Sequence, residues 1–291
     1  MNDKNNQQDK FFETDKKAYE MFLNGISLTR IAKELKIDRG SLTVRLKNKY
    51  SIKPNINGRK HSVDEHYFDV IDSEEKAYWL GFFYADAYNN GRRIEVGLQE
   101  RDYVHLEKLN KALKSTYPIR PIKETSSFRL DINSKALAEA LLTLGCVRNK
   151  SAIVSFPFSK IDRYLYKHFI RGIFDGDGTI SKVQLRKETV KACTLPRYIN
   201  KVSITTGSEK MADQLVGALK KYAYVDSYTT PDSRNNVKEI VIQGQSNIRT
   251  FLDFMYQDAT VYLDRKYYQY LQYVLPSGVE MLQMINGEKI W

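Results

Sequence analysis

Two aspartates, Asp86 and Asp177, each end an apolar segment of the chain that we expect to be helical. Near a helix C-terminus, unpaired carbonyl groups point outward and the helix dipole is negative. Two carboxylates brought together there repel each other, and each raises the pKa of the other. A divalent cation removes this conflict, and an all-oxygen site suits Mg²⁺ or a similarly hard ion. Paired acids that share metal ions are suited to splitting a phosphodiester.

The elements that must position these acids resemble two copies of one helix. When Trp79–Ala87 is aligned with Ile170–Gly178, glycines match at Gly81 and Gly172, and small residues match again four positions later. Small residues four positions apart lie on one helix face and allow two backbones to approach closely. If the helices pair along these faces, both carboxylates arrive side by side at the same end. A single Asp-Gly-Asp-Gly is more often a turn or a calcium loop, but its duplication favours a shared metal site.

The two segments resemble the signature motifs of the LAGLIDADG homing endonucleases, in the form that carries two repeats in one chain. The resemblance covers roughly residues 77–275, and the second copy fits it closely. The first copy departs at Tyr84, where the family has an acid, and at Ala87, where it has glycine. The resemblance implies an α+β fold, a pseudo-twofold duplicated αββαββα saddle.

The resemblance also implies which residues act at the site. Asp86 and Asp177 would hold the metal ions, together with the main-chain carbonyl groups of Ala85 and Gly176. Three residues outside the signature helices would be catalytic: Lys150, Lys266 and Gln99. A lysine there stabilises charge on the phosphate or orients the attacking water, and the glutamine orders water at the scissile phosphate. Without the resemblance, an ordinary surface residue is the better interpretation of each lysine.

Segments of alternating polarity predict sheets with one apolar and one polar face. Arg93–Gln99 shows this alternation, Phe128–Asn133 and Lys182–Arg186 repeat it, and the next strand is expected to continue it. Arginine reads guanine, and glutamine or asparagine reads adenine, although an ordinary solvated sheet face is the alternative for any single residue. The candidate DNA-binding residues here are Arg93, Glu95, Gln99, Arg101, Arg129, Lys182, Gln184, Arg186, Lys201, Ser203 and Thr205.

A basic block precedes the repeats. Between Lys16 and Lys60 the chain carries eight lysines and four arginines against three acids, a net +9 of the total +11. Three short helices are expected there, the last from Leu42 after a tight turn, which resembles a helix-turn-helix. In that motif the start of the last helix enters the major groove. The candidate contacts are Arg39, Ser41, Thr43 and Arg45. A small helical bundle that docks on protein is the alternative.

The sequence divides into a disordered tail (1–15), a helix-turn-helix domain (16–50), a basic linker (51–72), a first repeat (73–155), a second repeat (156–275) and a C-terminal tail (276–291). Further helices are expected over Tyr103–Leu113, Ser134–Leu144, Glu209–Tyr222 and Asn247–Tyr256. The two cysteines lie far apart without CxxC spacing, which excludes a zinc site and a disulfide framework. No segment has the apolar length of a membrane span and the polar start lacks signal-peptide features, so a cytoplasmic location is expected.

These features together predict a monomeric, Mg²⁺-dependent endonuclease for a long, asymmetric site in double-stranded DNA. One alternative keeps the scaffold without cleavage, as a transcription regulator or as a maturase that binds intron RNA. Paired acids argue against it, because a binding protein has no need for carboxylates facing phosphates. A third possibility is a helix-turn-helix repressor with a ligand-sensing domain, against which the duplicated motif argues.

Overall fold

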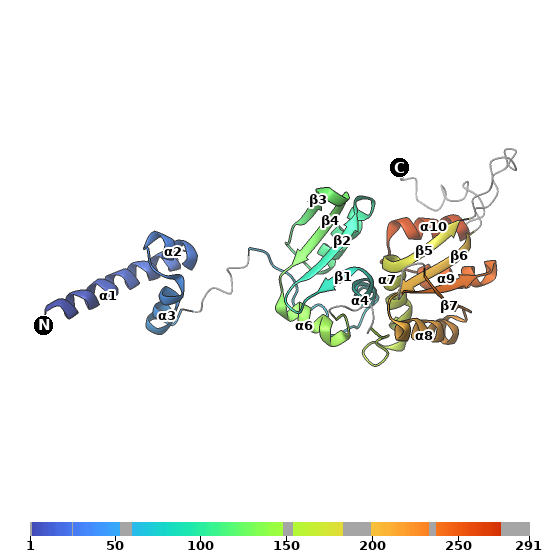
Figure 1. The fold of residues 1–291 in the computed structure, drawn as a ribbon, viewed down its shortest axis with the longest axis horizontal. Coiled ribbons are helices and arrows are strands. Elements are labelled where there is room, and N and C mark those ends of the chain that lie inside the picture. Colours follow the sequence, from blue (N-terminus) through green and yellow to red (C-terminus); the bar gives the residue numbers. More distant parts are fainter. Residues whose placement is uncertain are drawn as a thin grey trace. The chain divides into compact units, whose positions relative to one another are not determined.

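The chain forms two units with separate hydrophobic cores, divided between His61 and Ser62 (Figure 1). The computed structural model describes residues 2–24, 26–52, 60–147, 154–182, 199–232 and 237–274. Within these ranges, no helix combines the length and apolar character that crossing a bilayer requires.

Three helices build the first unit: α1 (Asn2–Leu23), α2 (Leu28–Glu34) and α3 (Arg39–Tyr50). Side chains cap the two shorter helices, because Ser27 accepts from the Arg30 N–H and Asp38 accepts from the Ser41 N–H. The helices pack around a small core whose buried members are Ala18, Ile31, Ala32, Leu42, Leu46 and Ile52.

Two boundaries in this unit differ from the prediction. Helix α1 begins at Asn2, whereas the polar composition of residues 1–15 predicts a disordered tail. Glutamine and lysine have high helix propensity, so the packed helix extends through this polar stretch. Helix α3 begins at Arg39, three residues before the expected Leu42, because the Asp38 cap outweighs the helix-breaking tendency of Gly40.

The predicted linker over residues 51–72 is also wrong in extent. The Ser62 N–H donates to Thr116 Oγ1 at 2.8 Å, and the Thr116 N–H donates to the Ser62 carbonyl at 2.9 Å. Further along, Tyr67, Phe68 and Ile71 are buried in the core of the second unit. The second unit therefore begins at Ser62, because apolar residues that are spaced irregularly in sequence still contribute to its core.

Two copies of one element order make up the second unit. The first copy contains α4 (Glu74–Asp86), β1 (Ala87–Asn89), β2 (Ile94–Gln99), α5 (Tyr103–Ala112), β3 (Ile119–Ile122), β4 (Ser127–Ile132) and α6 (Lys135–Leu144). The second contains α7 (Tyr166–Asp177), β5 (Gly178–Lys182), β6 (Ile199–Thr206), α8 (Glu209–Ala218), β7 (Tyr228–Pro231), β8 (Lys238–Gln243) and α9 (Gln245–Tyr256). Both sheets are antiparallel, with strand orders β1-β2-β4-β3 and β5-β6-β8-β7. The predicted α+β duplication is confirmed, and α10 (Asp264–Val274) is an unpredicted addition.

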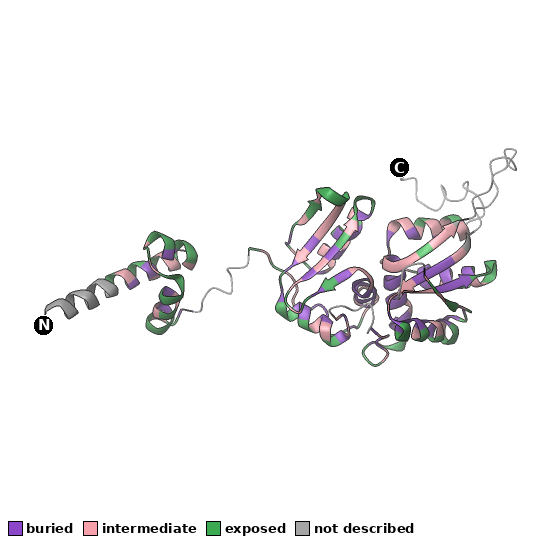
Figure 2. Cartoon of the chain, viewed as in Figure 1, coloured by how far each residue is buried: buried purple, intermediate pink, exposed green. Residues whose placement is uncertain are grey.

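Each sheet presents one face to its helices and one face outward. In the first sheet, Ile94 and Val96 are buried in the core that the helices share. The register pairs Glu95 with Asp131 and Gly97 with Arg129, which places these residues on the opposite face. Along β2 and β4, buried residues are separated by less buried ones, as the colours in Figure 2 indicate. The alternation in the sequence therefore predicts the two faces correctly.

The signature helices α4 and α7 pack backbone against backbone, as their small residues predict. A Cβ atom on Gly81 would lie 2.9 Å from the Phe169 carbonyl carbon, and one on Gly172 would lie 2.7 Å from the Phe82 nitrogen. Real Cβ contacts are not this short, so only glycine allows the observed approach. The paired helices form the centre of the core of the second unit (Figure 1).

Candidate active site

The carboxylate groups of Asp86 and Asp177 lie at the ends of the paired helices. A Cβ atom on Gly176 would lie 2.8 Å from Asp86 Oδ2, so this carboxylate faces the residue that precedes Asp177. The negative charges of both carboxylates also raise the pKa of one residue, Lys266, so both acids lie near it. The two acids, one from each repeat, therefore occupy one small region at the junction of α4 and α7.

The two departures of the first repeat do not disturb this end of the helix. Ala87 leaves α4 with φ −86° and ψ 140°, and Gly178 leaves α7 with φ −88° and ψ 157°. These are the same extended conformation, which alanine adopts without strain. The Tyr84 hydroxyl donates to the Leu144 carbonyl at 2.6 Å, and thereby ties the helix end to the last turn of α6.

Asp175 occupies in the second repeat the position that Tyr84 has in the first. It accepts hydrogen bonds, whereas Tyr84 donates one. It is 1% exposed and accepts hydrogen bonds from the Leu263 N–H at 2.7 Å and from two hydroxyl groups, Tyr78 at 2.8 Å and Tyr256 at 2.5 Å. Burial raises the pKa of this carboxyl group, and the charge of Lys266 and the three hydrogen bonds oppose that rise. In both repeats a buried polar side chain fixes the end of the signature helix to a neighbouring segment.

A fully buried cation, Arg171, joins the two repeats. Its guanidinium donates to the carbonyl groups of Val261 at 2.9 Å and Met255 at 2.7 Å, and to Glu74 Oε1 at 2.5 Å. Burial opposes the ionisation of Glu74, but the Thr260 N–H and the Arg171 charge outweigh it, and the pKa of Glu74 is lowered. Because Glu74 begins α4 and Arg171 lies within α7, this ion pair fixes the register of the two signature helices.

Lys266 lies beneath the acids and caps α7. Its ammonium donates to the carbonyl groups of Phe174, of Asp175 at 2.9 Å and of Gly178 at 2.6 Å. The residue is 2% exposed, and burial lowers the pKa of its ammonium to about 8. All three N–H bonds of the ammonium are directed at main-chain carbonyl groups, so Lys266 caps α7 in this structure. The direct contact with phosphate or water that the resemblance implies stays a prediction.

Lys266→Met should therefore destabilise the second unit by about 3 kcal/mol, because it leaves buried carbonyl groups and the Asp175 carboxylate without their cation. Urea unfolding followed by tryptophan fluorescence measures the change. Lys108→Met is the matched control, since Lys108 pairs with Asp264 at 2.5 Å on a part-exposed surface and should cost less than about 1 kcal/mol. A Lys266→Met chain as stable as the wild type, but defective only in cleavage, would restore the catalytic assignment.

The donor set fits a magnesium ion. Among the described residues, no group of three or more histidine, cysteine, aspartate or glutamate side chains could hold a metal. Asp86 and Asp177 instead offer two carboxylates beside the main-chain carbonyl groups of Ala85 and Gly176. Mg²⁺ is bound through one or two carboxylates and takes its other ligands from water and substrate phosphate. The Thr205 hydroxyl supports this end of the site, because it donates to the Asp177 carbonyl at 3.1 Å.

On the outward face of the first sheet, three predicted DNA contacts, Arg93, Glu95 and Arg129, are part of an ion-pair network. Arg93 Nη2 lies 2.8 Å from Asp131 Oδ1 and 3.1 Å from Glu95 Oε1. Arg129 Nε lies 3.1 Å from Asp131 Oδ1, and its Nη1 lies 3.6 Å from Glu95 Oε2. The two acids hold both guanidinium groups over the sheet. Asp131 belongs to this network but was not among the predicted DNA contacts. Gln99 and Arg101, at the end of the same strand and just beyond it, are exposed.

On the second sheet, the candidate contacts that the structure describes are Lys201, Ser203 and Thr205. Lys201 Nζ lies 2.8 Å from Glu239 Oε1. Ser203 shares this face but is 2% exposed, so it has no surface to offer a base. Strand β5 ends at Lys182, whose side chain is outside the description, and Gln184 and Arg186 lie outside the described residues. Lys150 also lies outside them.

In the first unit, the predicted contacts divide into two groups. Arg39 and Ser41 are exposed at the start of α3. Arg45 instead turns inward, where its Nη2 lies 2.5 Å from Oδ1 of Asp15, which is 6% exposed. The Thr43 hydroxyl donates to the Arg39 carbonyl at 2.7 Å. Arg45 and Thr43 therefore stabilise the unit itself, and a helical pattern alone did not reveal these partners.

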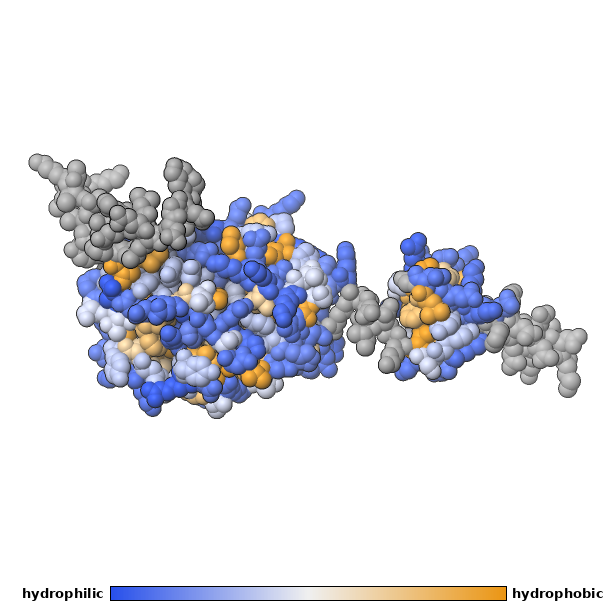
Figure 3. All heavy atoms as spheres, turned by 180° about the vertical axis from the view of Figure 1, so that it is seen from behind, coloured by the Kyte–Doolittle hydropathy of each residue, from blue (hydrophilic) through white to orange (hydrophobic). Residues whose placement is uncertain are grey.

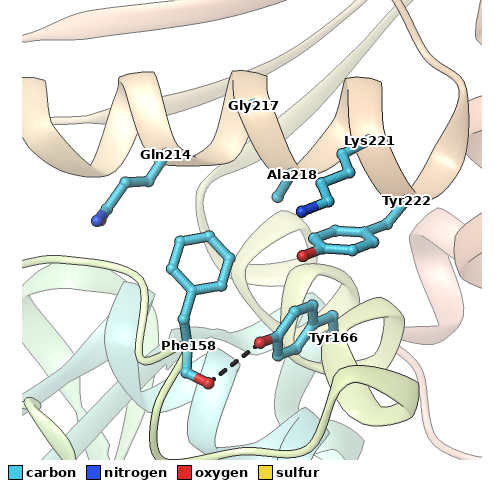
Figure 4. Close-up of a pocket in the computed structure, with 7 residues that line it drawn as sticks. All are labelled: Phe158, Tyr166, Gln214, Gly217, Ala218, Lys221 and Tyr222. Atoms are coloured by element: carbon cyan, nitrogen blue, oxygen red, sulfur yellow. Dashed lines mark hydrogen bonds between the residues drawn. The ribbon is translucent and has the colours of Figure 1, made fainter.

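A hollow of about 430 Å³ lies in the second repeat, away from the two signature aspartates (Figure 4). Its lining residues are Phe158, Tyr166, Gln214, Gly217, Ala218, Lys221 and Tyr222. None of these is an acid, and neither signature aspartate borders it. Figure 4 shows the aromatic rings gathered below α8, with the Tyr166 hydroxyl directed to the Phe158 carbonyl. We therefore assign the chemistry to the helix ends and not to this hollow.

Comparison with protein families identifies a LAGLIDADG-like domain over residues 165–255. This range begins at the second signature helix and ends within α9, so it covers most of the second repeat. A curated relative, the replication factor C small subunit of Methanocaldococcus jannaschii, is 27% identical over 188 residues, which are 62% of this chain. The match spans only 9% of the length of that relative.

Two solved structures illustrate the structural likeness. The N-terminal LAGLIDADG domain of DUF199/WhiA is 17% identical, with a TM-score of 0.44 over 70% of this chain and 92% of that one. Meganuclease I-SmaMI, in a complex with uncleaveable DNA, is 14% identical, with a TM-score of 0.45 over 68% of this chain and 88% of that one.

Proposed function

We propose that the chain is a site-specific endonuclease that cuts double-stranded DNA by metal-assisted phosphodiester hydrolysis. The observation that carries this proposal is the approach of the Asp86 carboxylate to Gly176, beside Asp177, at the joined ends of two helices. A protein that only binds DNA gains nothing from two acids directed at phosphates. One chain supplies both acids, so the site needs no second copy and the protein should act as a monomer.

Different residues of the chain would have different roles in cleavage. Asp86 and Asp177, with the carbonyl groups of Ala85 and Gly176, would hold Mg²⁺ between the two strands. A divalent cation there supplies an acidified water and neutralises charge on the phosphate. Lys266 keeps the end of α7 in place, and Gln99 is exposed at the end of β2, where it can order water. The two sheets carry different sets of predicted contacts, so they would meet different half-sites of an asymmetric target.

The first unit would extend the DNA contact beyond the central site. Its charge is concentrated between Lys16 and Lys60, where the net charge is +9. Basic residues that neutralise phosphates raise affinity without selecting sequence, and they make binding dependent on salt. In this proposal the unit lengthens the target, and the second unit cuts it.

A cleavage assay tests the proposal. The full chain is incubated with linear duplexes that include the joined flanks of its own gene, with Mg²⁺ in one series and with EDTA in the other. We expect a double-strand cut that depends on Mg²⁺. If duplexes are bound but none is cut at any Mg²⁺ concentration, the endonuclease proposal is wrong and a binding role remains.

One observation favours that second role, a transcription regulator or a maturase on intron RNA. All three N–H bonds of Lys266 are committed to carbonyl groups, which removes one cation from the phosphate. We rank cleavage first, because the paired acids have no use in a regulator.

A further inference from the structure

Two exposed residues of α3, Gly40 and Val44, disfavour the helix and add no buried side chain to the core of the first unit. Gly40 lies in its first turn, and Val44 lies one turn later with 57% of its surface exposed. Glycine and β-branched valine both weaken a helix interior. A Cβ atom on Gly40 would crowd Asp38 Oδ1 at 3.2 Å, and this oxygen is the cap that accepts from the Ser41 N–H, so the glycine also leaves room for the cap. Val44 has no such contact with its own unit, so its benefit is expected outside the unit.

Their spacing places both on the outward side of the helix. Gly40, Val44 and Lys47 follow one another at intervals of four and three, so they form one row along α3, the outward row. Leu42 and Leu46 lie on the other side and are buried in the core of the unit. Ser41 and Asn48 flank the row and are exposed.

We propose that Val44 reads the C5 methyl group of a thymine in the major groove. This inference rests on the proposed binding of the first unit to duplex DNA, and it adds the residue that gives the unit sequence preference. An apolar side chain in contact with this methyl distinguishes thymine from the other bases. Valine has one strongly preferred rotamer in a helix, so its contact surface is already in place.

The neighbours of Val44 in the outward row suit the same contact. Gly40 lacks a side chain, which lets the edge of a base pair approach the helix one turn before Val44. Lys47 supplies an exposed cation one turn after it, and lysine side chains contact phosphate oxygens. Arg45 and Thr43 are committed within the unit, so the outward row replaces them as the surface that meets DNA.

Deoxyuridine, which is thymidine without the methyl group, provides the test. Duplexes that the full chain selects from a random pool in EDTA are prepared with one thymine at a time replaced by deoxyuridine. We expect one replacement to weaken wild-type binding about fourfold, the value of one buried methyl group. Val44→Ala should bind the two duplexes equally. Leu23→Ala, which alters a side chain of α1 that is 65% exposed, should keep the wild-type preference.

The proposal fails if Val44→Ala keeps the preference for thymine at every position, or if no thymine methyl affects the wild type. Lys47→Ala distinguishes these failures from a failure of the underlying function. If the first unit binds DNA, Lys47→Ala lowers affinity for all duplexes and reduces the salt slope by about 1. If Lys47→Ala changes neither quantity, the unit does not bind DNA, and both proposals for it are wrong. Circular dichroism checks that each variant keeps its helix content.

Discussion

Asp177→Asn is expected to lower Mg²⁺-dependent cleavage about 1,000-fold, while affinity for the same duplex stays within about threefold. Asparagine keeps the size and shape of the side chain but removes the negative charge that holds the cation. The main-chain carbonyl of Asp177 still accepts from Thr205 and the Lys266 cap still closes α7, so the local backbone should not change. Cleavage of a labelled duplex and its binding in EDTA are measured on the same preparation.

Two further variants make this result interpretable. Asp86→Asn should have an effect of similar size, because the two acids act as a pair. Asp213→Asn alters an exposed acid of α8 in the same repeat and should leave cleavage unchanged. An Asp177→Asn chain that still cuts both strands would show that the acid does not hold the cation.

Gly172→Ala is expected to destabilise the second unit by at least about 3 kcal/mol. The added methyl would overlap the Tyr78 carbonyl oxygen and lie 2.7 Å from the Phe82 nitrogen, and both atoms belong to the backbone of α4. A backbone cannot rotate away as a side chain can, so α4 and α7 must separate along their whole contact. Urea unfolding gives the loss of stability directly.

Gly217→Ala is the matched control for this substitution. Gly217 lies within α8, and a Cβ atom there would meet nothing within 4 Å. Alanine should therefore stabilise this helix by about 0.5–1 kcal/mol. If Gly172→Ala and Gly217→Ala behave alike, the close packing of the signature helices does not hold the two repeats together.

The sequence predicted most of the fold because its signals were local and repeated. Alternation gave the strands β2 and β4, and caps such as Ser134 gave the helix starts. The matched glycines gave the pairing of α4 with α7. Strands β1, β3, β7 and β8 and helix α10 were missed. Strands β1, β3 and β7 have too few residues for a period to emerge, and β8 has three apolar residues in a row and so no alternation. Helix α10 follows no second copy that would reveal it.

The buried polar groups of the site were harder to predict. Arg171 and Asp175 lie within the second signature motif itself, and charged residues in an apolar helix signal that partners must exist. Those partners are Glu74, 97 positions away, and Tyr78, also 97 positions away. Only the folded chain brings them together, so the sequence showed the need for partners without naming them. The resemblance predicts Lys266 beside the metals, and the charges of Asp86 and Asp177 do act on it, but its carbonyl partners were not visible in the sequence.

The exposed faces of the two sheets show what alternation in the sequence does not predict. Alternation assigns a residue to a face, but it does not say what that residue contacts there. Arg93 and Arg129 face outward as predicted, yet both are held by Glu95 and Asp131. Ser203 faces outward as well and is covered by its neighbours. Accessible surface depends on cross-strand pairs, which a single strand does not reveal.

The most direct test of the account locates the cation itself. Crystals of the full chain with a duplex that it binds, grown in Mn²⁺, would show the ion by anomalous diffraction. The account predicts a peak at about 2.0–2.6 Å from a carboxylate oxygen of Asp86 and also of Asp177. A cation bound by one of these acids alone, or by neither, would contradict the claim that the two helices of the chain assemble one shared site.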